Sequence, residues 1–119
     1  CVLLKENHIL SIGSLKKSIE KALYEYPDKP VIVEVESLGQ LKIALPIQGI
    51  TRILCDNFSP QELLEAVVIA KGICPLETSG NINEKNIIDY AETGVDFISI
   101  GSITKNIHSI DLSLKFDLN

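Results

Sequence analysis

The chain contains 119 residues, 45% of them hydrophobic, and carries a formal net charge of −5. This size and composition suit one domain with a core, while the acidic balance disfavours general nucleic-acid binding. No apolar run is long enough to span a membrane and no signal peptide is visible, so we expect a soluble, cytoplasmic protein. Because the chain lacks methionine and opens on an apolar run, we also expect a fragment whose upstream part is missing.

The first half of the chain predicts alternating strands and helices. Short apolar runs with β-branched residues predict strands at residues 2–4, 31–33 and 53–55, covered by helices on both faces. Ser14 precedes a helical face within residues 15–26, and residues 37–40 are typical of a capping box before the next helix. Residues 59–62, Ser-Pro-Gln-Glu, give the strongest helix start, since they combine a serine cap, an early proline and a glutamate that reaches back.

The second half continues the alternation. Residues 73–76 predict a fourth strand, although Pro75 cannot donate to a central ladder. Asn83 opens a predicted helix that Gly94 can end, and residues 97–100 predict a fifth strand. Residues 49–56 resemble residues 94–101, and this repeated βα unit predicts an α/β fold with a parallel sheet, either a barrel or a doubly wound sheet. Residues 111–116 alternate, which predicts a half-exposed last strand that pairs outside the barrel.

Five of the predicted strands end on polar or glycine residues suited to a charged ligand. They are Lys5, Glu36, Asp56, the Glu77-Thr78-Ser79-Gly80 run and Gly101. Ligands of parallel βα proteins bind at the carboxyl ends of the strands, so these residues describe one site. A lysine, carboxylates and glycine turns together favour a phosphorylated sugar.

Motifs along nearly the whole chain resemble the quinolinate phosphoribosyltransferases, which are carboxylating nicotinate-nucleotide pyrophosphorylases. The motifs are Val2-Leu3-Leu4-Lys5-Glu6-Asn7-His8-Ile9, Val33-Glu34-Val35-Glu36, Leu54-Cys55-Asp56-Asn57-Phe58, Glu77-Thr78-Ser79-Gly80-Asn81-Ile82 and Gly94-Val95-Asp96-Phe97-Ile98-Ser99-Ile100-Gly101. The resemblance implies that residues 1–119 are the carboxyl-terminal part of a TIM-like barrel domain, without the amino-terminal domain and the first strands.

The resemblance also implies an activity. The family transfers phosphoribosyl from phosphoribosyl pyrophosphate (PRPP) to quinolinate with decarboxylation, giving nicotinate mononucleotide, pyrophosphate and CO2 for NAD biosynthesis. Mg²⁺ bound with PRPP is the implied cofactor, with no protein residue assigned to it. A homodimer or higher homo-oligomer is the implied assembly of the intact protein.

Individual site residues follow from the same resemblance. Lys5 is assigned to the substrate carboxylate and pyrophosphate, and Glu36 and Asp56 to the ribose hydroxyls. Glu34 falls on the face of Glu36 by the two-residue period of a strand. The implied phosphate-gripping turns comprise Ser79, Gly80, Asn81, Gly101 and Ser102, with Asn81 standing where the family often has a second glycine.

The remaining reactive side chains receive no chemical role. Cys1, Cys55 and Cys74 lack metal-binding spacing and are expected to be reduced thiols. His8 is expected to be a hydrogen-bonded neighbour of the site rather than a base. Arg52, the only arginine, is expected to precede its strand and to point to the opposite end of the barrel.

The arginines that bind quinolinate in the family would lie upstream, so the chain alone is expected to be inactive. Two alternatives stay open from the sequence. One is a related phosphoribosyltransferase of the kind found with molybdate-transport genes, which the upstream arginines would distinguish. The other is a non-catalytic phosphate-binding βα module, which would bind sugar phosphates without releasing pyrophosphate.

Overall fold

The computed structural model describes residues 1–5, 14–100 and 113–115, in which strands and helices alternate. The strands are β1 (Val2–Leu4), β2 (Val31–Val35), β3 (Arg52–Asp56), β4 (Leu76–Ser79), β5 (Phe97–Ser99) and β6 (Ser113–Lys115). The helices are α2 (Leu15–Glu25), α3 (Leu38–Ala44), α4 (Pro60–Ala70) and α5 (Ile87–Ala91). This order confirms the predicted βα repeat, and β6 confirms a last strand within the segment predicted for it.

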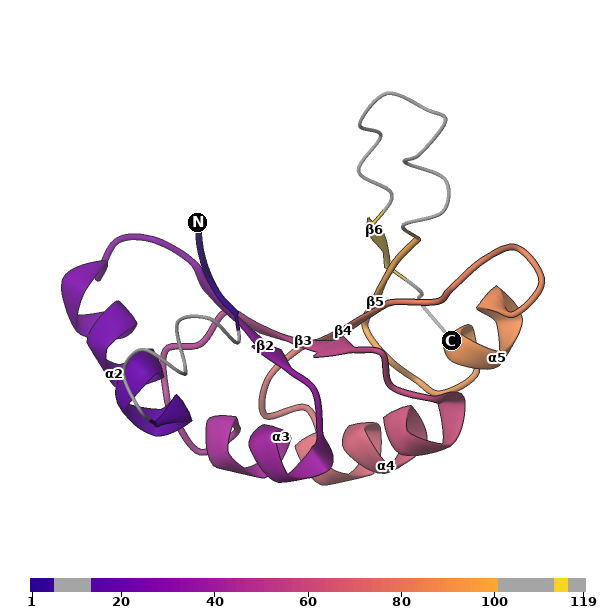
Figure 1. Cartoon of the computed structure of the whole chain (residues 1–119), viewed down its shortest axis with the longest axis horizontal. Helices are drawn as coiled ribbons and strands as arrows, with labels where there is room; N and C mark the ends of the chain where they lie inside the picture. Colours follow the sequence, from indigo (N-terminus) through magenta and orange to yellow (C-terminus); the bar gives the residue numbers. More distant parts are fainter. Residues whose placement is uncertain (6–13, 101–112, 116–119) are drawn as a thin grey trace.

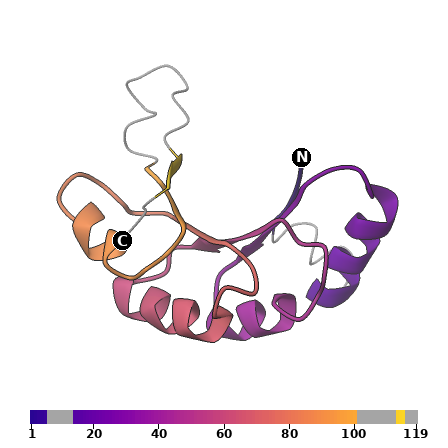
Figure 2. The ribbon, with the colours of Figure 1, turned by 180° about the vertical axis from the view of Figure 1, so that it is seen from behind.

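All six strands form one sheet in the order of the sequence. Neighbouring strands from β1 to β5 are parallel, whereas β6 runs antiparallel to β5. Helices α2, α3 and α4 line the convex side of the curved sheet, and α5 continues this layer beyond α4 (Figure 1). The view from behind shows the same one-sided arrangement (Figure 2). The expectation of helices on both faces is therefore wrong for the described part of the chain, and the arrangement is that of a barrel wall rather than a doubly wound sheet.

The core lies between the sheet and its helices. Alternate residues of β2, Val31, Val33 and Val35, are fully buried, because every second side chain of a strand points to the same face. They meet apolar side chains from the helices, among them the fully buried Ile19 and Leu41. Each such side chain contributes about 1.5–3 kcal/mol when it leaves water, so this layer holds the sheet in its curved form.

Serine caps begin three of the helices, as the sequence predicts. Ser14 accepts a hydrogen bond from the amide of Lys17, and Ser59 forms the full reciprocal capping box with Glu62. The α3 box differs from the prediction, because the Gln40 side chain accepts from the amide of Glu36 and not from that of the cap residue Ser37. None of the helices in the described residues could cross a membrane.

The predicted starts of β4 and α5 are wrong. Strand β4 begins at Leu76, so Pro75 lies before the strand and the polar residues Glu77 and Ser79 lie inside it. Helix α5 begins at Ile87 and not directly after Asn83. The Asn83 side chain instead accepts hydrogen bonds from the amides of Lys85 and Asn86, which forms a local turn that competes with helix.

Candidate functional site

The concave side of the sheet displays polar residues of the strands. In β2 and β3 the side chains of Val35 and Cys55 are buried under the helices, while Glu34 and Asp56 are only partly buried. Successive side chains of a strand point to opposite faces. Glu34 and Asp56 therefore occupy the face that carries no helix in the described residues, at the carboxyl ends of their strands.

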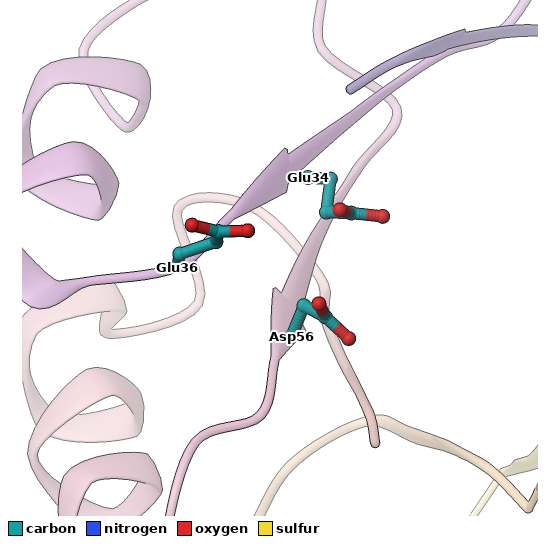
Figure 3. A group of neighbouring side chains, drawn as sticks. All are labelled: Glu34, Glu36 and Asp56. Atoms are coloured by element: carbon teal, nitrogen blue, oxygen red, sulfur yellow. The ribbon is translucent and has the colours of Figure 1, made fainter. Parts of the chain in front are cut away.

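Three carboxylates gather at these strand ends (Figure 3). One oxygen from each of Glu34, Glu36 and Asp56 lies within 4.8 Å of the others, and Glu36 is the exposed member. Negative charges this close repel one another, so the group favours a cation or hydroxyl donors between its members. The structure thus brings together Glu36 and Asp56, the residues that the sequence predicts, with Glu34, which the two-residue period puts on the same face.

Lys5 directly follows β1 and is exposed. Leu4 pairs with Val33 in the parallel register of β1 and β2, so the next position along both strands sets Lys5 beside Glu34. The ammonium group is a compact charge on a flexible stem, which suits contact with an anion that changes position during a reaction. The register therefore brings a cation to the edge of the acidic group.

The end of β4 is bonded to the end of β3. Ser79 Oγ donates a hydrogen bond of 3.1 Å to Asp56 Oδ1. One residue further along β3, the amide of Asn57 donates to the carbonyl oxygen of Ser79 at 3.0 Å. Ser79, predicted as part of a phosphate turn, therefore also orients the carboxylate of Asp56.

The turn after β4 contains Gly80 and Asn81. Gly80 has a φ of +121°, in the region that favours glycine, and its carbonyl accepts from the amide of Ile82 at 2.7 Å. Asn81 is exposed and has no left-handed φ, so replacing the family's second glycine requires no unusual backbone here. Its carbonyl accepts from Asn86 Nδ2 at 2.8 Å, which ties the turn to the start of α5.

The prediction that both turns lead straight into helices is wrong for the first turn, since α5 begins only at Ile87 and has five residues. An anion at Gly80 would meet backbone amides of a turn rather than a helix amino terminus. The second predicted turn, Gly101 and Ser102, lies outside the described residues, as does His8.

A second polar group on the concave side joins Glu77, which the sequence places in the predicted site, to Arg52, which it does not. The Glu77 carboxylate accepts from Arg52 Nη1 at 3.0 Å and from Ser99 Oγ at 3.1 Å. The Arg52 guanidinium also lies 4.1 Å from the ring centre of Phe97. Arg52 is the first residue of β3 and not a residue before it, so that prediction is wrong. One sequence signal could have placed Arg52 on the concave side: side chains of a strand alternate between its faces, so Arg52 lies on the same face as Asp56.

The cysteines of the described residues are free thiols, and only Cys1 is exposed. Burial, together with the neighbouring Cys74, raises the pKa of Cys55 to about 12. Burial and the charge of Asp96 also raise the pKa of Cys74, against a lowering contribution from the backbone of Ile53. Thiols held in the protonated form are poor nucleophiles and poor metal ligands, so Cys55 and Cys74 act as core residues.

A family model and individual relatives from comparison with known proteins agree with each other. Residues 1–115 match the family described as quinolinate phosphoribosyl transferase, C-terminal domain. The chain is 39% identical over 122 residues to the probable nicotinate-nucleotide pyrophosphorylase (carboxylating) of Methanocaldococcus jannaschii, covering 96% of this chain and 42% of the relative. It is 34% identical over 115 residues to the nicotinate-nucleotide pyrophosphorylase (carboxylating) of Mycobacterium leprae, covering 94% and 40%.

Solved structures agree with these relatives. The nicotinate-nucleotide pyrophosphorylase from Francisella tularensis superposes with a TM-score of 0.84 at 45% identity, covering 90% of this chain and 38% of that one. The enzyme of the same name from Ehrlichia chaffeensis gives a TM-score of 0.81 at 39% identity, covering 87% and 37%. The chain spans 42% or less of the length of each of these proteins.

Proposed function

The chain belongs to the quinolinate phosphoribosyl transferase family, and from this premise we propose that the intact protein is a carboxylating nicotinate-nucleotide pyrophosphorylase. It transfers phosphoribosyl from PRPP to quinolinate, releasing pyrophosphate and CO2 and forming nicotinate mononucleotide for NAD biosynthesis. Because the chain spans less than half of the length of the relatives that it matches, the activity is proposed for the intact protein.

The observation that carries the proposal is the acidic group on the concave side. Oxygens of Glu34, Glu36 and Asp56 within 4.8 Å of one another can accept from neighbouring ribose hydroxyls. As pyrophosphate leaves, positive charge develops at the anomeric carbon, and fixed carboxylates stabilise that charge more than they stabilise the neutral sugar. Ser79 holds Asp56 at 3.1 Å, so this carboxylate is oriented before the sugar arrives.

Lys5 and the turns supply the complementary charges. Lys5, set beside Glu34 by the strand register, would face the pyrophosphate and the carboxylate of quinolinate. The backbone of Ser79, Gly80 and Asn81 would hold the 5-phosphate, together with Gly101 and Ser102. The phosphate would then lie at the ends of β4 and β5, and the anomeric carbon toward β2, next to the lysine.

Mg²⁺ bound with PRPP is part of the proposal, and the residues present fit it. Magnesium prefers oxygen ligands, and the acidic group offers only carboxylate oxygens, so Glu34, Glu36 and Asp56 would hold the ion directly or through its water molecules. When bound, the ion supplies charge neutralisation for the pyrophosphate. The carboxylates themselves accept from the ribose and keep their charge near the anomeric carbon.

Assembly and compartment complete the proposal. We infer that this sheet is one wall of a TIM-like barrel, which its one-sided helices support. We also propose a homodimer or higher homo-oligomer, in which a neighbour completes the quinolinate site as in the family. A cytoplasmic location is supported by the free thiols of Cys55 and Cys74, since disulfides are rare in reducing compartments.

The experiment is a product assay on the intact protein with PRPP, carboxyl-labelled quinolinate and Mg²⁺. We expect equal amounts of nicotinate mononucleotide, pyrophosphate and released CO2. PRPP binding without pyrophosphate release would favour a phosphate-binding module instead. Pyrophosphate release with another acceptor, but never with quinolinate, would favour a related phosphoribosyltransferase.

A further inference from the structure

We propose that Asn57 is a positioning residue for the sugar-phosphate site, which rests on the proposed function. Asn57 is the first residue after β3, next to Asp56, and it contacts the turn that follows β4. Through this contact the Asp56 carboxylate and the Ser79-Gly80 turn form one unit with a fixed spacing. Asn57 itself touches no substrate in this proposal.

The backbone of Asn57 gives the first observation. Its φ is +59°, and among the described residues only Lys71 shares a positive φ outside glycine. Asparagine tolerates this left-handed conformation better than most residues do. The amide of Asn57, one residue beyond the last residue of β3, donates to the carbonyl of Ser79 at 3.0 Å.

The second observation is the close approach of Gly80. A Cβ atom on Gly80 would lie 2.5 Å from Asn57 Oδ1 and 3.1 Å from both the Cα and the N of Asn57. Nonbonded carbon and oxygen atoms do not approach to 2.5 Å, so a Cβ atom here would force the Asn57 side chain to shift, and the φ of +121° independently favours glycine. The Asn57 side chain therefore packs directly on the turn that is proposed to hold the phosphate.

The residues that follow Asn57 in the chain are fixed in place. Phe58 is fully buried in the core, and Ser59 caps α4 through the box with Glu62. The residue between Asp56 and Phe58 thus has fixed neighbours in the strand, the core and the helix start. A residue so constrained can transmit a fixed position to Gly80, whereas one in a free loop could not.

The functional consequence concerns PRPP. Its ribose and its 5-phosphate are covalently linked, so the carboxylate and the turn must stand at one spacing to engage both. Misplacement of a substrate group by about 1 Å can cost about 100-fold in rate. A turn that is held less firmly should therefore cost part of this factor. The binding of quinolinate, which does not depend on this spacing, should be much less affected.

The test is steady-state kinetics and PRPP titration on variants of the intact protein. Asn57→Gly removes the side chain and keeps the left-handed backbone free of strain, so it isolates the contact with Gly80. We expect the KM of PRPP to rise about tenfold while the KM of quinolinate stays within about twofold. Lys71→Gly is the matched control, since Lys71 also has a positive φ but lies at the far end of α4, and it should change neither constant.

A second variant tests the contact from the other side. Gly80→Ala should raise the dissociation constant of PRPP about 100-fold, and adding Asn57→Gly should recover about tenfold of this loss by removing the 2.5 Å contact. Recovery remains partial because the positive φ of Gly80 still strains alanine. If Gly80→Ala does not fold, the Asn57→Gly kinetics decide alone.

Each outcome points one way. If Asn57→Gly lowers the turnover number and leaves both KM values unchanged, Asn57 only stabilises the fold, and the inference is wrong. An unchanged PRPP constant in Asn57→Gly, or no recovery in the double variant, would also overturn it. A wild-type protein that binds no PRPP would instead refute the proposed function, whatever the variants do.

Discussion

Replacing Arg52 by methionine tests the contribution of the Arg52–Glu77 pair to stability. Glu77 has a side chain only 9% exposed and forms an ion pair with Arg52 at 3.0 Å. Removal of one partner of a buried ion pair costs about 3–5 kcal/mol, because the other charge is left without compensation. The Arg52 side chain is 25% exposed and Ser99 still donates to Glu77, so we expect a smaller loss, about 2–3 kcal/mol in the free energy of unfolding.

The assay is urea denaturation of the intact protein, followed by far-UV circular dichroism. The midpoint should shift to lower urea without a change in the slope m, since the surface exposed on unfolding stays the same. Lys21→Met is the matched control, because Lys21 pairs with Glu25 on the surface of α2 at 3.8 Å. An exposed pair one helical turn apart contributes only about 0.3–0.5 kcal/mol, so this variant should unfold close to the wild type.

The double variant Arg52→Met with Glu77→Gln separates charge from packing. Glutamine keeps an acceptor for Ser99 but carries no charge, so the double variant should lose less stability than Arg52→Met alone, by about 1–2 kcal/mol. A double variant as unstable as the single one would show that the stacking of Arg52 on Phe97, and not its charge, stabilises this region. A single variant within about 0.5 kcal/mol of the wild type would refute the reasoning altogether.

Three further predictions concern the site, the core and a helix start. In the intact protein Asp56→Asn should lower kcat by about 10–100-fold while quinolinate affinity changes less, because the lost charge acts on the developing cation; an unchanged kcat would remove Asp56 from the mechanism. Because burial raises the pKa of Cys55 to about 12 from an ordinary 9.0, its thiol stays protonated in the folded state while the unfolded thiol ionises. The free energy of unfolding should therefore fall above about pH 9, by at most about 1.4 kcal/mol per pH unit, and Cys55→Ala should flatten this decline in alkaline denaturation curves. Ser59→Ala should cost about 1 kcal/mol in urea denaturation, and a cost below that of Ser37→Ala would contradict the importance of the full capping box.

Local signals made much of the fold predictable. The Ser59-Pro60-Gln61-Glu62 run begins a helix because cap, proline and glutamate interact within one turn, independently of the rest of the chain. Period-two patterns likewise placed Glu34 with Glu36 on one face. Neighbouring parallel strands end at the same edge of a sheet, so Glu36 and Asp56 lie together as predicted.

Features that depend on the register between strands were not predictable. The Arg52–Glu77 pair joins β3 to β4, and a single sequence does not say which residues of neighbouring strands stand side by side. Strand β4 was placed too early because Glu77 and Ser79 are polar, yet they lie within the strand on its concave face. The left-handed backbone of Asn57 was allowed by residue type, but its contact with Gly80 also depends on register.

The one-sided cover of the sheet also bears on how the protein can change over evolutionary time. Within β3, Ile53 and Cys55 face the helices while Leu54 and Asp56 face the open side. Substitution at the first pair disturbs packing, whereas substitution at the second alters what the concave face presents while leaving the apolar layer intact. Specificity can therefore drift at Leu54 and Asp56 without disturbing the packing of Ile53 and Cys55. A saturation scan of residues 53–56 should show effects on protein abundance mainly at the first pair and effects on activity mainly at the second.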